Sequence, residues 1–421
     1  MTTQLAAANS LPAEEGLLER TGAAIVMAAL DKMRNGRLTV TLPDGTTRVF
    51  GDPASPVRAS LRVKRSDFFR RVLMWGDVGF GEAYQAGDFE TDDLTGLIRL
   101  FIENGEAMEV ENTRWALWGN VRNRLRHLLN KNTVGGSRRN IYAHYDLGNE
   151  FFKLFLDPTM MYSCARFEDG DTLESAQIRK VDSILDKARV TAGDHVLEIG
   201  SGWGTLAARA VARGAKVTTL TISQRQFEHC KARFAREGIS DRAEVRFCDY
   251  RVAQGAYDKI VSIEMIEAVG HEYLGIFFAT CDRLLKPDGL VVIQGITIPD
   301  QRYEAYRRGC DWIQKHIFPG ALLPSLTVMC DALTQNTNLV VEDVENIGIH
   351  YARTLREWRR ALLAKADEVR AQGFDDAFLR TWVYYFSYCE AGFGTRTLGD
   401  VQLVLTRPNN KRLPVPSAVE S

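Results

Sequence analysis

From about residue 140 onward, short apolar runs alternate with stretches in which apolar residues recur at helical spacing. The helical stretches, such as Gln224–Glu237 and Leu274–Leu285, are predicted helices. This alternation predicts an α/β fold with a Rossmann-like, doubly wound and mainly parallel sheet. The predicted strands are His195–Ile199, Lys216–Ile222, Ala243–Cys248, Lys259–Ile263 and Leu290–Ile298.

The alternation is less regular toward the C-terminus. An irregular block covers 299–338, and a long helix over Leu355–Gln372 and a last strand over Val401–Thr406 follow it. These elements close a domain that we expect to span 140–408. Residues 409–421 are rich in small or polar residues and proline, which predicts a flexible tail.

The first hundred residues show a different pattern. An apolar helix over Ala23–Arg34 precedes a hairpin signal at Pro43-Asp-Gly45, and a second helical stretch starts at Ser66. This order predicts a small α+β domain over 21–111, preceded by a flexible tail at 1–20.

Residues 112–139 contain seven basic residues and no acidic ones. Tryptophan and aliphatic residues recur between them at helical spacing, which predicts a basic amphipathic linker helix. Such a helix suits an anionic membrane surface. A linker that packs on a neighbouring domain and leaves its arginines in solvent would show the same pattern.

Composition and charge limit the class of protein. The chain has 421 residues, 45% hydrophobic and 25% charged, so two soluble domains are expected. The formal net charge of −1 excludes a globally basic nucleic-acid binder. Seven scattered cysteines without a C-x-x-C pair favour a reducing compartment and argue against a zinc site. No segment approaches the ~20 apolar residues of a membrane span, and a cytoplasmic protein is expected.

The loop after the predicted strand His195–Ile199 carries the strongest chemical signal. Glu198 is followed by Gly200, Gly202 and Gly204, and a helix begins directly afterwards. Glycines permit positive φ and a close backbone approach, and the helix N-terminus presents unpaired N–H groups. The E-x-G-x-G-x-G spacing is typical of S-adenosylmethionine methyltransferases, in which the acid reaches the cationic end of the cofactor.

The ends of the next strands add candidates for the same crevice. Thr221 and Gln226 could bind ribose hydroxyls, while Ser223 is a good helix N-cap. Asp249 could accept from an exocyclic amine or only cap its loop, and Tyr250 could cover an adenine ring.

Longer motifs resemble a known family, the cyclopropane-fatty-acyl-phospholipid synthases, which depend on S-adenosylmethionine and are related to the mycolic-acid cyclopropane synthases. The stretch Ile296–Arg407 looks especially similar to the methyltransferase portion of plant cyclopropane synthases. The other motifs that carry the resemblance are Tyr142–Cys164, Glu198–Gly204, Thr219–Gln226 and Ser262–Gly270.

The resemblance implies a binding site for the sulfonium cofactor. A sulfonium cation favours aromatic faces and an acid, which agrees with these residue types. The matching positions are Tyr145, Tyr162, Ser163, Gly200, Gly202, Thr221, Ile222, Gln226, Asp249 and Tyr250.

The resemblance also implies the reaction, transfer of a methylene unit to a cis double bond of a phospholipid acyl chain in a bilayer. An alkene offers no proton to remove beforehand, so we expect catalysis from alignment in a dry pocket. A base must then take a proton from the new methyl group. In the family this base is a bound bicarbonate ion, and the matching positions are Cys164, Glu267, Gln294, Ile296 and Tyr351.

Each of these residues has an expected role. Glu267 would accept from the bicarbonate hydroxyl, Tyr351 would donate its phenolic hydrogen, and Cys164 would donate its backbone N–H. Two positions depart from the family, because many relatives have histidine where this chain has Gln294 and Ala268.

A second glutamate and a cysteine leave alternatives open. Glu264 precedes Glu267 by one turn and could be the real acid or a helix partner. Cys389 matches a cysteine given as an active-site residue in the family, but a thiolate has no obvious task here, and a buried structural role is favoured. Trp312 and Phe318 could wall an acyl channel or serve ordinary packing, and block 299–338 is the expected lid over the acyl chain.

The leading hypothesis is therefore a cyclopropane synthase, cytoplasmic and peripheral at the inner membrane face, with no nucleic-acid partner. A rival loses a different proton and gives methylene- or methyl-branched chains. A third reading is a lipid-binding or regulatory protein with an inactive methyltransferase domain. The resemblance leaves open whether the chain forms a homodimer.

Overall fold

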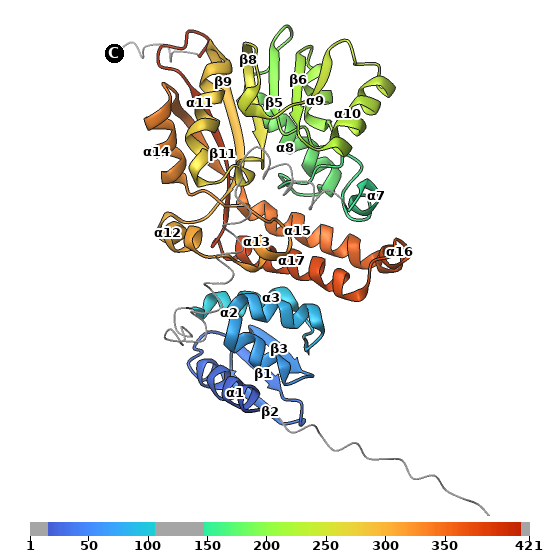
Figure 1. Ribbon diagram of the computed structural model, residues 1–421, viewed down its shortest axis with the longest axis vertical. Coiled ribbons are helices and arrows are strands. Elements are labelled where there is room, and N and C mark those ends of the chain that lie inside the picture. The colour runs from blue at the N-terminus through green and yellow to red at the C-terminus, as the bar shows by residue number, and fades with distance from the viewer. Residues whose placement is uncertain (1–15, 106–146, 414–421) are drawn as a thin grey trace, which may run out of the picture. The chain divides into compact units, whose positions relative to one another are not determined.

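The computed structural model describes residues 16–105 and 147–413, which fall into two units (Figure 1). The first unit runs to Asp93 and includes Asn104. The second contains helix α3 (Leu94–Glu103) and the described chain from residue 147 on. The basic segment 112–139 and Tyr145 lie outside the described residues.

The first unit is a small α+β fold. Its sheet has the order β2-β1-β3-β4, with β1 and β2 forming the expected antiparallel hairpin and β3 parallel to β1. Alternate residues of β1, Leu38 and Val40, are fully buried and so build the core. The elements are α1 (Leu17–Leu30), β1 (Arg37–Thr41), β2 (Thr47–Gly51), β3 (Arg58–Val63), α2 (Asp67–Ala86) and β4 (Phe89–Glu90).

The second unit is built on a seven-stranded sheet of order β10-β11-β9-β8-β5-β6-β7. The five strands predicted from the apolar runs are present, and neighbours among them are parallel, which confirms the doubly wound prediction. β11 is antiparallel to both of its neighbours. The strands are β5 (His195–Ile199), β6 (Lys216–Thr221), β7 (Ala243–Phe247), β8 (Tyr257–Ile263), β9 (Leu285–Thr297), β10 (Val340–Asn346) and β11 (Gly399–Thr406).

Helices cover both faces of this sheet (Figure 1). Side chains alternate across a strand, so Val196 packs toward one helical layer and Leu197 toward the other. The layer on Leu197 contains α11 (Leu274–Leu284) and α14 (Leu326–Asn336). The layer on Val196 contains α8 (Leu173–Lys187), α9 (Thr205–Ala212) and α10 (Gln224–Arg236).

The C-terminal part differs from the sequence-based prediction. The expected long helix is two helices, α15 (Gly348–Ala364) and α16 (Ala366–Ala371), and block 299–338 contains helices α12 (Asp300–Arg308), α13 (Trp312–His316) and α14. Helix α17 (Asp376–Gly394) was not predicted. Residues Val383–Ser387 are all buried, so α17 lacks the one-sided periodicity that marks an amphipathic helix.

Edge strand β10 was also missed. Most of its side chains are exposed and several are acidic, so no apolar run marks it, and it exists through its pairing with β11. Among the helices of the described residues, none is long and apolar enough to cross a bilayer.

Candidate active site

The order of the strands fixes where a ligand can bind. From β5 the chain proceeds outward through β6 and β7, and it then returns to the other side of β5 to form β8 and β9. Open α/β sheets bind ligands outside the carboxyl ends of the strands at such a reversal. The glycine loop after β5 and the turn that carries Glu264 after β8 therefore flank the same crevice.

The glycine loop has the backbone that only glycine adopts readily. Gly200, Gly202 and Gly204 have φ of 99°, 49° and 85°. A Cβ on Gly204 would lie 2.9 Å from Cε1 of Phe234, whereas a Cβ on Gly202 would have no atom of the described chain within 4 Å. Gly204 is thus required for packing, and Gly202 borders open space.

Neighbouring side chains hold this loop in place. The Trp203 indole N–H donates to Oδ1 of Asn149 at 3.0 Å. Arg233 of α10 donates to the Trp203 carbonyl oxygen at 3.1 Å and to Oγ1 of Thr205 at 2.7 Å. The loop is therefore fixed by contacts that need no ligand.

Glu198 is a buried acid with an unused oxygen. Its side chain lies at the end of β5 in a residue only 4% exposed, and no donor among the described residues reaches Oε2. Burial raises its pKa to about 8. A cationic ligand in the crevice would supply the missing partner, so Glu198 and the open space at Gly202 fit S-adenosylmethionine.

Beyond β6, the polar candidates bond to one another. The Thr221 hydroxyl donates to Oε1 of Gln226 at 2.8 Å. Ser223 accepts from the Gln226 backbone N–H, so the expected N-cap of α10 is present. Ile222 lies between them and is half-buried. The group is preformed beside the crevice, and its role toward a cofactor stays a prediction.

Asp249 is held by its neighbour Arg251. The guanidinium donates to both carboxylate oxygens, at 2.9 and 2.7 Å, and Asp249 caps the short helix η1 (Tyr250–Val252). The capping role that the sequence left open is thus observed. Tyr250 packs edge-on against Phe277 with ring centroids 5.5 Å apart.

Tyr162 and Ser163 lead into the buried part of the site. The Tyr162 hydroxyl donates to that of Tyr385 at 3.1 Å, and its ring lies 5.2 Å from Trp358. Ser163 Oγ accepts from Nζ of Lys180 at 2.6 Å. Lys180 is fully buried, which lowers its pKa to about 8.

The residues expected around bicarbonate converge instead on Glu264. Its Oε1 accepts from the Cys164 backbone N–H at 2.7 Å and from Nε2 of Gln294 at 2.8 Å. Its Oε2 accepts from the Tyr351 hydroxyl at 2.6 Å. Glu264 has a φ of 48°, in the left-handed region that a glutamate seldom occupies.

Glu267 lies in a separate contact, in the short helix η2 (Ile266–Ala268). Its Oε1 accepts from the Ile296 backbone N–H, while Oε2 has no donor among the described residues. Burial, with a smaller contribution from the charge of Glu264, raises the pKa of Glu267 to about 8. The five expected residues therefore form two groups, one on Glu264 and one on Glu267.

A polar ladder behind Glu264 was not found from sequence. Gln294 and Gln402 face each other on β9 and β11, and the Gln402 amide donates to the Gln294 oxygen at 3.2 Å. Gln294 also donates to Oδ2 of Asp400 at 3.0 Å. Burial and the charge of Glu264 raise the pKa of Asp400. The signal available in the sequence was a glutamine inside each of two apolar strands.

Cys389 is in different surroundings. It lies on α17, and burial together with the charge of Asp311 raises the pKa of its thiol, which keeps it protonated. This agrees with a structural role. Two aromatic residues were candidates for the wall of an acyl channel. The Trp312 ring packs on Tyr384 with centroids 4.5 Å apart, and the centroid of the Phe318 ring lies 6.4 Å from that of Tyr162.

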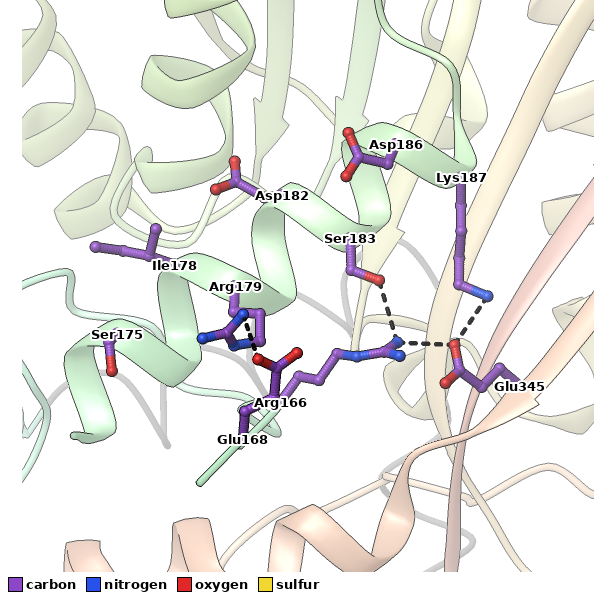
Figure 2. Close-up of a pocket in the computed structure, with 10 residues that line it drawn as sticks. All are labelled: Arg166, Glu168, Ser175, Ile178, Arg179, Asp182, Ser183, Asp186, Lys187 and Glu345. Carbon is purple, nitrogen blue, oxygen red and sulfur yellow. Dashed lines mark hydrogen bonds and ion pairs between the residues drawn. The ribbon is translucent and has the colours of Figure 1, made fainter. Parts of the chain in front are cut away.

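Two hollows accompany the site. One, of about 550 Å³, runs along α8 and holds none of the expected site residues. Figure 2 shows Arg166 between Ser183 and Glu345, with Lys187 reaching the same glutamate, so these cations already have acidic partners. The other, of about 240 Å³, is lined by both apolar and polar residues and includes Phe393, whose ring stacks on that of Tyr351 with centroids 4.5 Å apart.

Known proteins are similar to this chain over most of its length. The family model described as mycolic acid cyclopropane synthetase matches residues 134–403. The chain is 40% identical over 379 residues to tuberculostearic acid methyltransferase of Mycobacterium tuberculosis, covering 88% of each protein. It is 35% identical to cyclopropane-fatty-acyl-phospholipid synthase of Escherichia coli, covering 83% of this chain and 88% of that protein.

A solved structure matches about two thirds of the chain. A mycolic acid cyclopropane synthase complexed with SAH and CTAB superposes with a TM-score of 0.60 at 32% identity. The match covers 64% of this chain and 98% of that one.

Proposed function

This chain belongs to the mycolic acid cyclopropane synthetase family, and on that premise we propose that it transfers a methylene unit from S-adenosylmethionine to a cis double bond of a phospholipid acyl chain. One juxtaposition carries the proposal. A Cβ on Gly200 would lie 3.4 Å from Met265, so the glycine loop touches the turn that carries Glu264. The donor site and the buried carboxylates are therefore side by side.

S-adenosylmethionine, when bound, supplies an electrophilic methyl group on a sulfonium. The chain's contribution is to hold that cation against the glycine loop, with Glu198 as its acidic partner. Thr221, Gln226 and Tyr250 line the neighbouring strand ends. This positioning replaces activation of the alkene, which has no proton to give up, and alignment of reactants is worth up to about 7–11 kcal/mol.

The acceptor side must exclude water, because water would trap a carbocation-like intermediate. The rings of Tyr162, Trp358, Tyr351 and Phe393 form a continuous series with centroids 4.5 to 6.0 Å apart. Aromatic faces also stabilise a cation without attacking it. The hollow of about 240 Å³ beside Phe393 has apolar lining residues such as Leu326 and Leu398, and we infer that it could hold part of an acyl chain.

Block 299–338 is proposed as the lid over the acyl chain. The Leu322 backbone N–H donates to the Glu267 carbonyl oxygen at 2.8 Å, so this block is tied to the turn after β8. Ile298 is likewise bonded through its N–H to the Pro324 carbonyl oxygen at 3.1 Å. Helix α14 belongs to the helical layer on the sheet, so the movement that would open the site is proposed for α12 and α13.

Action at a membrane face is proposed from the sequence alone, because the basic segment 112–139 lies outside the described residues. Its arginines and tryptophans suit an anionic leaflet, such as the cytoplasmic face of a bacterial membrane.

The decisive test is lipid analysis in a host that lacks such an enzyme. Cells that express the chain and receive a methyl-labelled donor precursor should carry label in phospholipid acyl tails, with the upfield proton resonances of a cyclopropane. Label confined to head groups or protein, or no label above the empty-vector control, would contradict the proposal.

A second candidate product is a methylene- or methyl-branched chain. It is favoured by the 40% identity to a relative named as a tuberculostearic acid methyltransferase. The same spectra separate the two, since a branched chain shows vinylic or methyl resonances in place of the upfield cyclopropane signals.

A further inference from the structure

The anion site that the family fills with bicarbonate is filled here by the chain itself. Carboxylate oxygens of Glu264 accept from Cys164, Gln294 and Tyr351, at 2.7, 2.8 and 2.6 Å. These are three of the five positions that the resemblance assigns to the bound ion. A fourth, Ile296, donates its N–H to Glu267.

Counting hydrogens shows that a second anion does not fit among these donors. A backbone N–H and a phenol each have one hydrogen, and both of these go to Glu264. The Gln294 amide has two, which go to Glu264 and Asp400 at 2.8 and 3.0 Å, and the Cys164 carbonyl oxygen is a third, more distant acceptor at 3.5 Å. Bicarbonate in the same place would meet the negative charge of Glu264 with no hydrogen left to bind it.

We propose that Glu264 is the built-in base of the reaction and takes the role that the family gives to bicarbonate. The inference rests on the proposed function. When the alkene π electrons form the bond to the methyl carbon, the carbon–sulfur bond breaks and its electron pair stays on sulfur. A carboxylate oxygen of Glu264 then takes a proton from that methyl group, and the released C–H electrons close the ring.

The local backbone supports a functional placement. Glu264 is held at a φ of 48°, a conformation that costs a non-glycine residue free energy and that recurs at functional sites. It is one residue from Met265, whose side chain borders Gly200 of the donor loop. The carboxylate thus lies between the glycine loop and the aromatic wall, the series of rings formed by Tyr162, Trp358, Tyr351 and Phe393.

Its surroundings keep the carboxylate oriented and ready to accept a proton. Three hydrogen bonds and the buried charge of Lys180 favour the ionised form, while burial has the larger, opposite effect and raises the pKa of Glu264. A carboxylate with a raised pKa is a stronger base than one in water. Asp400 and Gln402 fix Gln294 from behind, so they are positioning residues.

The first experiment uses the unmodified full chain with vesicles of unsaturated phospholipid and labelled S-adenosylmethionine. Turnover is measured in buffer purged of carbon dioxide and again with added bicarbonate. We expect the two rates to agree within twofold. A rate that falls at least tenfold without bicarbonate would overturn the inference, while absence of label in acyl chains under both conditions would overturn the proposed function and the inference with it.

The second experiment uses two variants at one position. Glu264→Gln keeps the shape but not the basicity, and we expect turnover to fall by about 10²–10⁴-fold at every bicarbonate concentration. Glu264→Gly suits the left-handed backbone. It also leaves the hydrogen-bond donors of Cys164, Gln294 and Tyr351 free to bind a small anion. We expect added bicarbonate to raise its turnover at least tenfold. Glu342→Gln, an exposed acid on β10, is the matched control and should keep the original rate.

A purely structural Glu264 would give a different result. Both variants would then lose thermal stability and donor affinity, and no small anion would restore the glycine variant. Full activity of Glu264→Gln would overturn the inference. It would also be overturned by a Glu264→Gly variant that folds and binds S-adenosylmethionine but does not respond to bicarbonate.

Discussion

At the scale of single residues, the site contains a buried acid, Glu198, whose burial lowers the stability of the fold. Glu198 has a raised pKa of about 8 and an oxygen without a donor among the described residues. Burying such a group costs free energy that a bound cation can recover. Residues of this kind mark places where the fold gives up stability for binding.

Replacing Glu198 with Gln should therefore have opposite effects on stability and on donor binding. Because the folded-state pKa lies above the usual value near 4.5, the neutral acid is favoured in the fold, and stability is lost as pH rises from 4.5 through 8. The variant lacks this loss, so at pH 9 it should be more stable than the original donor-free chain by about 1–3 kcal/mol. Urea unfolding at pH 5 and pH 9 measures the difference.

At pH 5 the same two proteins should differ much less, because Glu198 is then neutral. Affinity for S-adenosylmethionine, measured by calorimetry at pH 7, should fall at least tenfold. Equal stabilisation at both pH values, or unchanged affinity, would show that Glu198 does not act through its charge.

Gly202→Ala tests the open space on the donor loop. Its Cβ would meet nothing of the described chain, so a loss of cofactor affinity beyond that of a control with the same backbone strain indicates contact with the ligand. Gly238→Ala is the matched control, since Gly238 also has positive φ, at 68°, and open space, but it follows α10 away from the crevice. Each variant should cost about 1–2 kcal/mol of stability.

Only the Gly202 variant should weaken donor binding, by tenfold or more in equilibrium dialysis. Equal affinities of the two variants would remove Gly202 from the donor site.

At the scale of elements, the aromatic wall depends on the packing of α15 against α17. Both helices contribute to it, Tyr351 and Trp358 from α15 and Phe393 from α17. Glu390 of α17 is almost fully buried and accepts from Arg356 and Arg359 of α15, at 2.8 and 2.7 Å. This ion pair network joins the helices within three residues of Phe393.

Glu390→Ala should lower the free energy of unfolding by about 2 kcal/mol, because it leaves the partly buried Arg359 and the half-exposed Arg356 without their carboxylate. Arg360→Ala removes an exposed pair with Glu357 on the same helix and should change stability by less than about 0.5 kcal/mol. Chemical denaturation of both variants provides the comparison. A Glu390 variant as stable as the Arg360 variant would mean that apolar packing alone holds the two helices together.

At the scale of the whole molecule, the chain has to reach an acyl chain that lies in a bilayer. Reversing Arg122, Arg124 and Arg126 to Glu should reduce binding to vesicles rich in anionic lipid at least tenfold, because each basic residue near an anionic surface contributes about 1 kcal/mol. The matched control reverses three exposed arginines of the described residues to Glu and so makes the same change in charge. These are Arg236, Arg242 and Arg246. Sedimentation with vesicles at low and physiological salt measures binding.

If the two triple variants bind equally, segment 112–139 is only a linker. Turnover on detergent-dispersed lipid should stay unchanged in both, since neither set includes a residue of the proposed site.

The sequence by itself determined the features that depend on local patterns. The five parallel strands, the glycine loop and the Ser223 cap follow from apolar periodicity, backbone freedom and side-chain capping, which act over a few residues. The resemblance gave the family, which the matching family model confirms. It also brought Cys164, Gln294 and Tyr351 together, although they are far apart in the chain.

Only the tertiary structure decided which acid those residues meet. Glu264 and Glu267 are three residues apart, and helical spacing would treat them as equivalent members of one turn. The left-handed backbone at Glu264 separates them. Glu264 accepts hydrogen bonds from three distant segments, and Glu267 accepts one from Ile296. Helix α17, strand β10 and the ladder of Gln294, Gln402 and Asp400 were hidden for a related reason. Their stability comes from burial and pairing across the fold, and such contacts leave no period in the sequence.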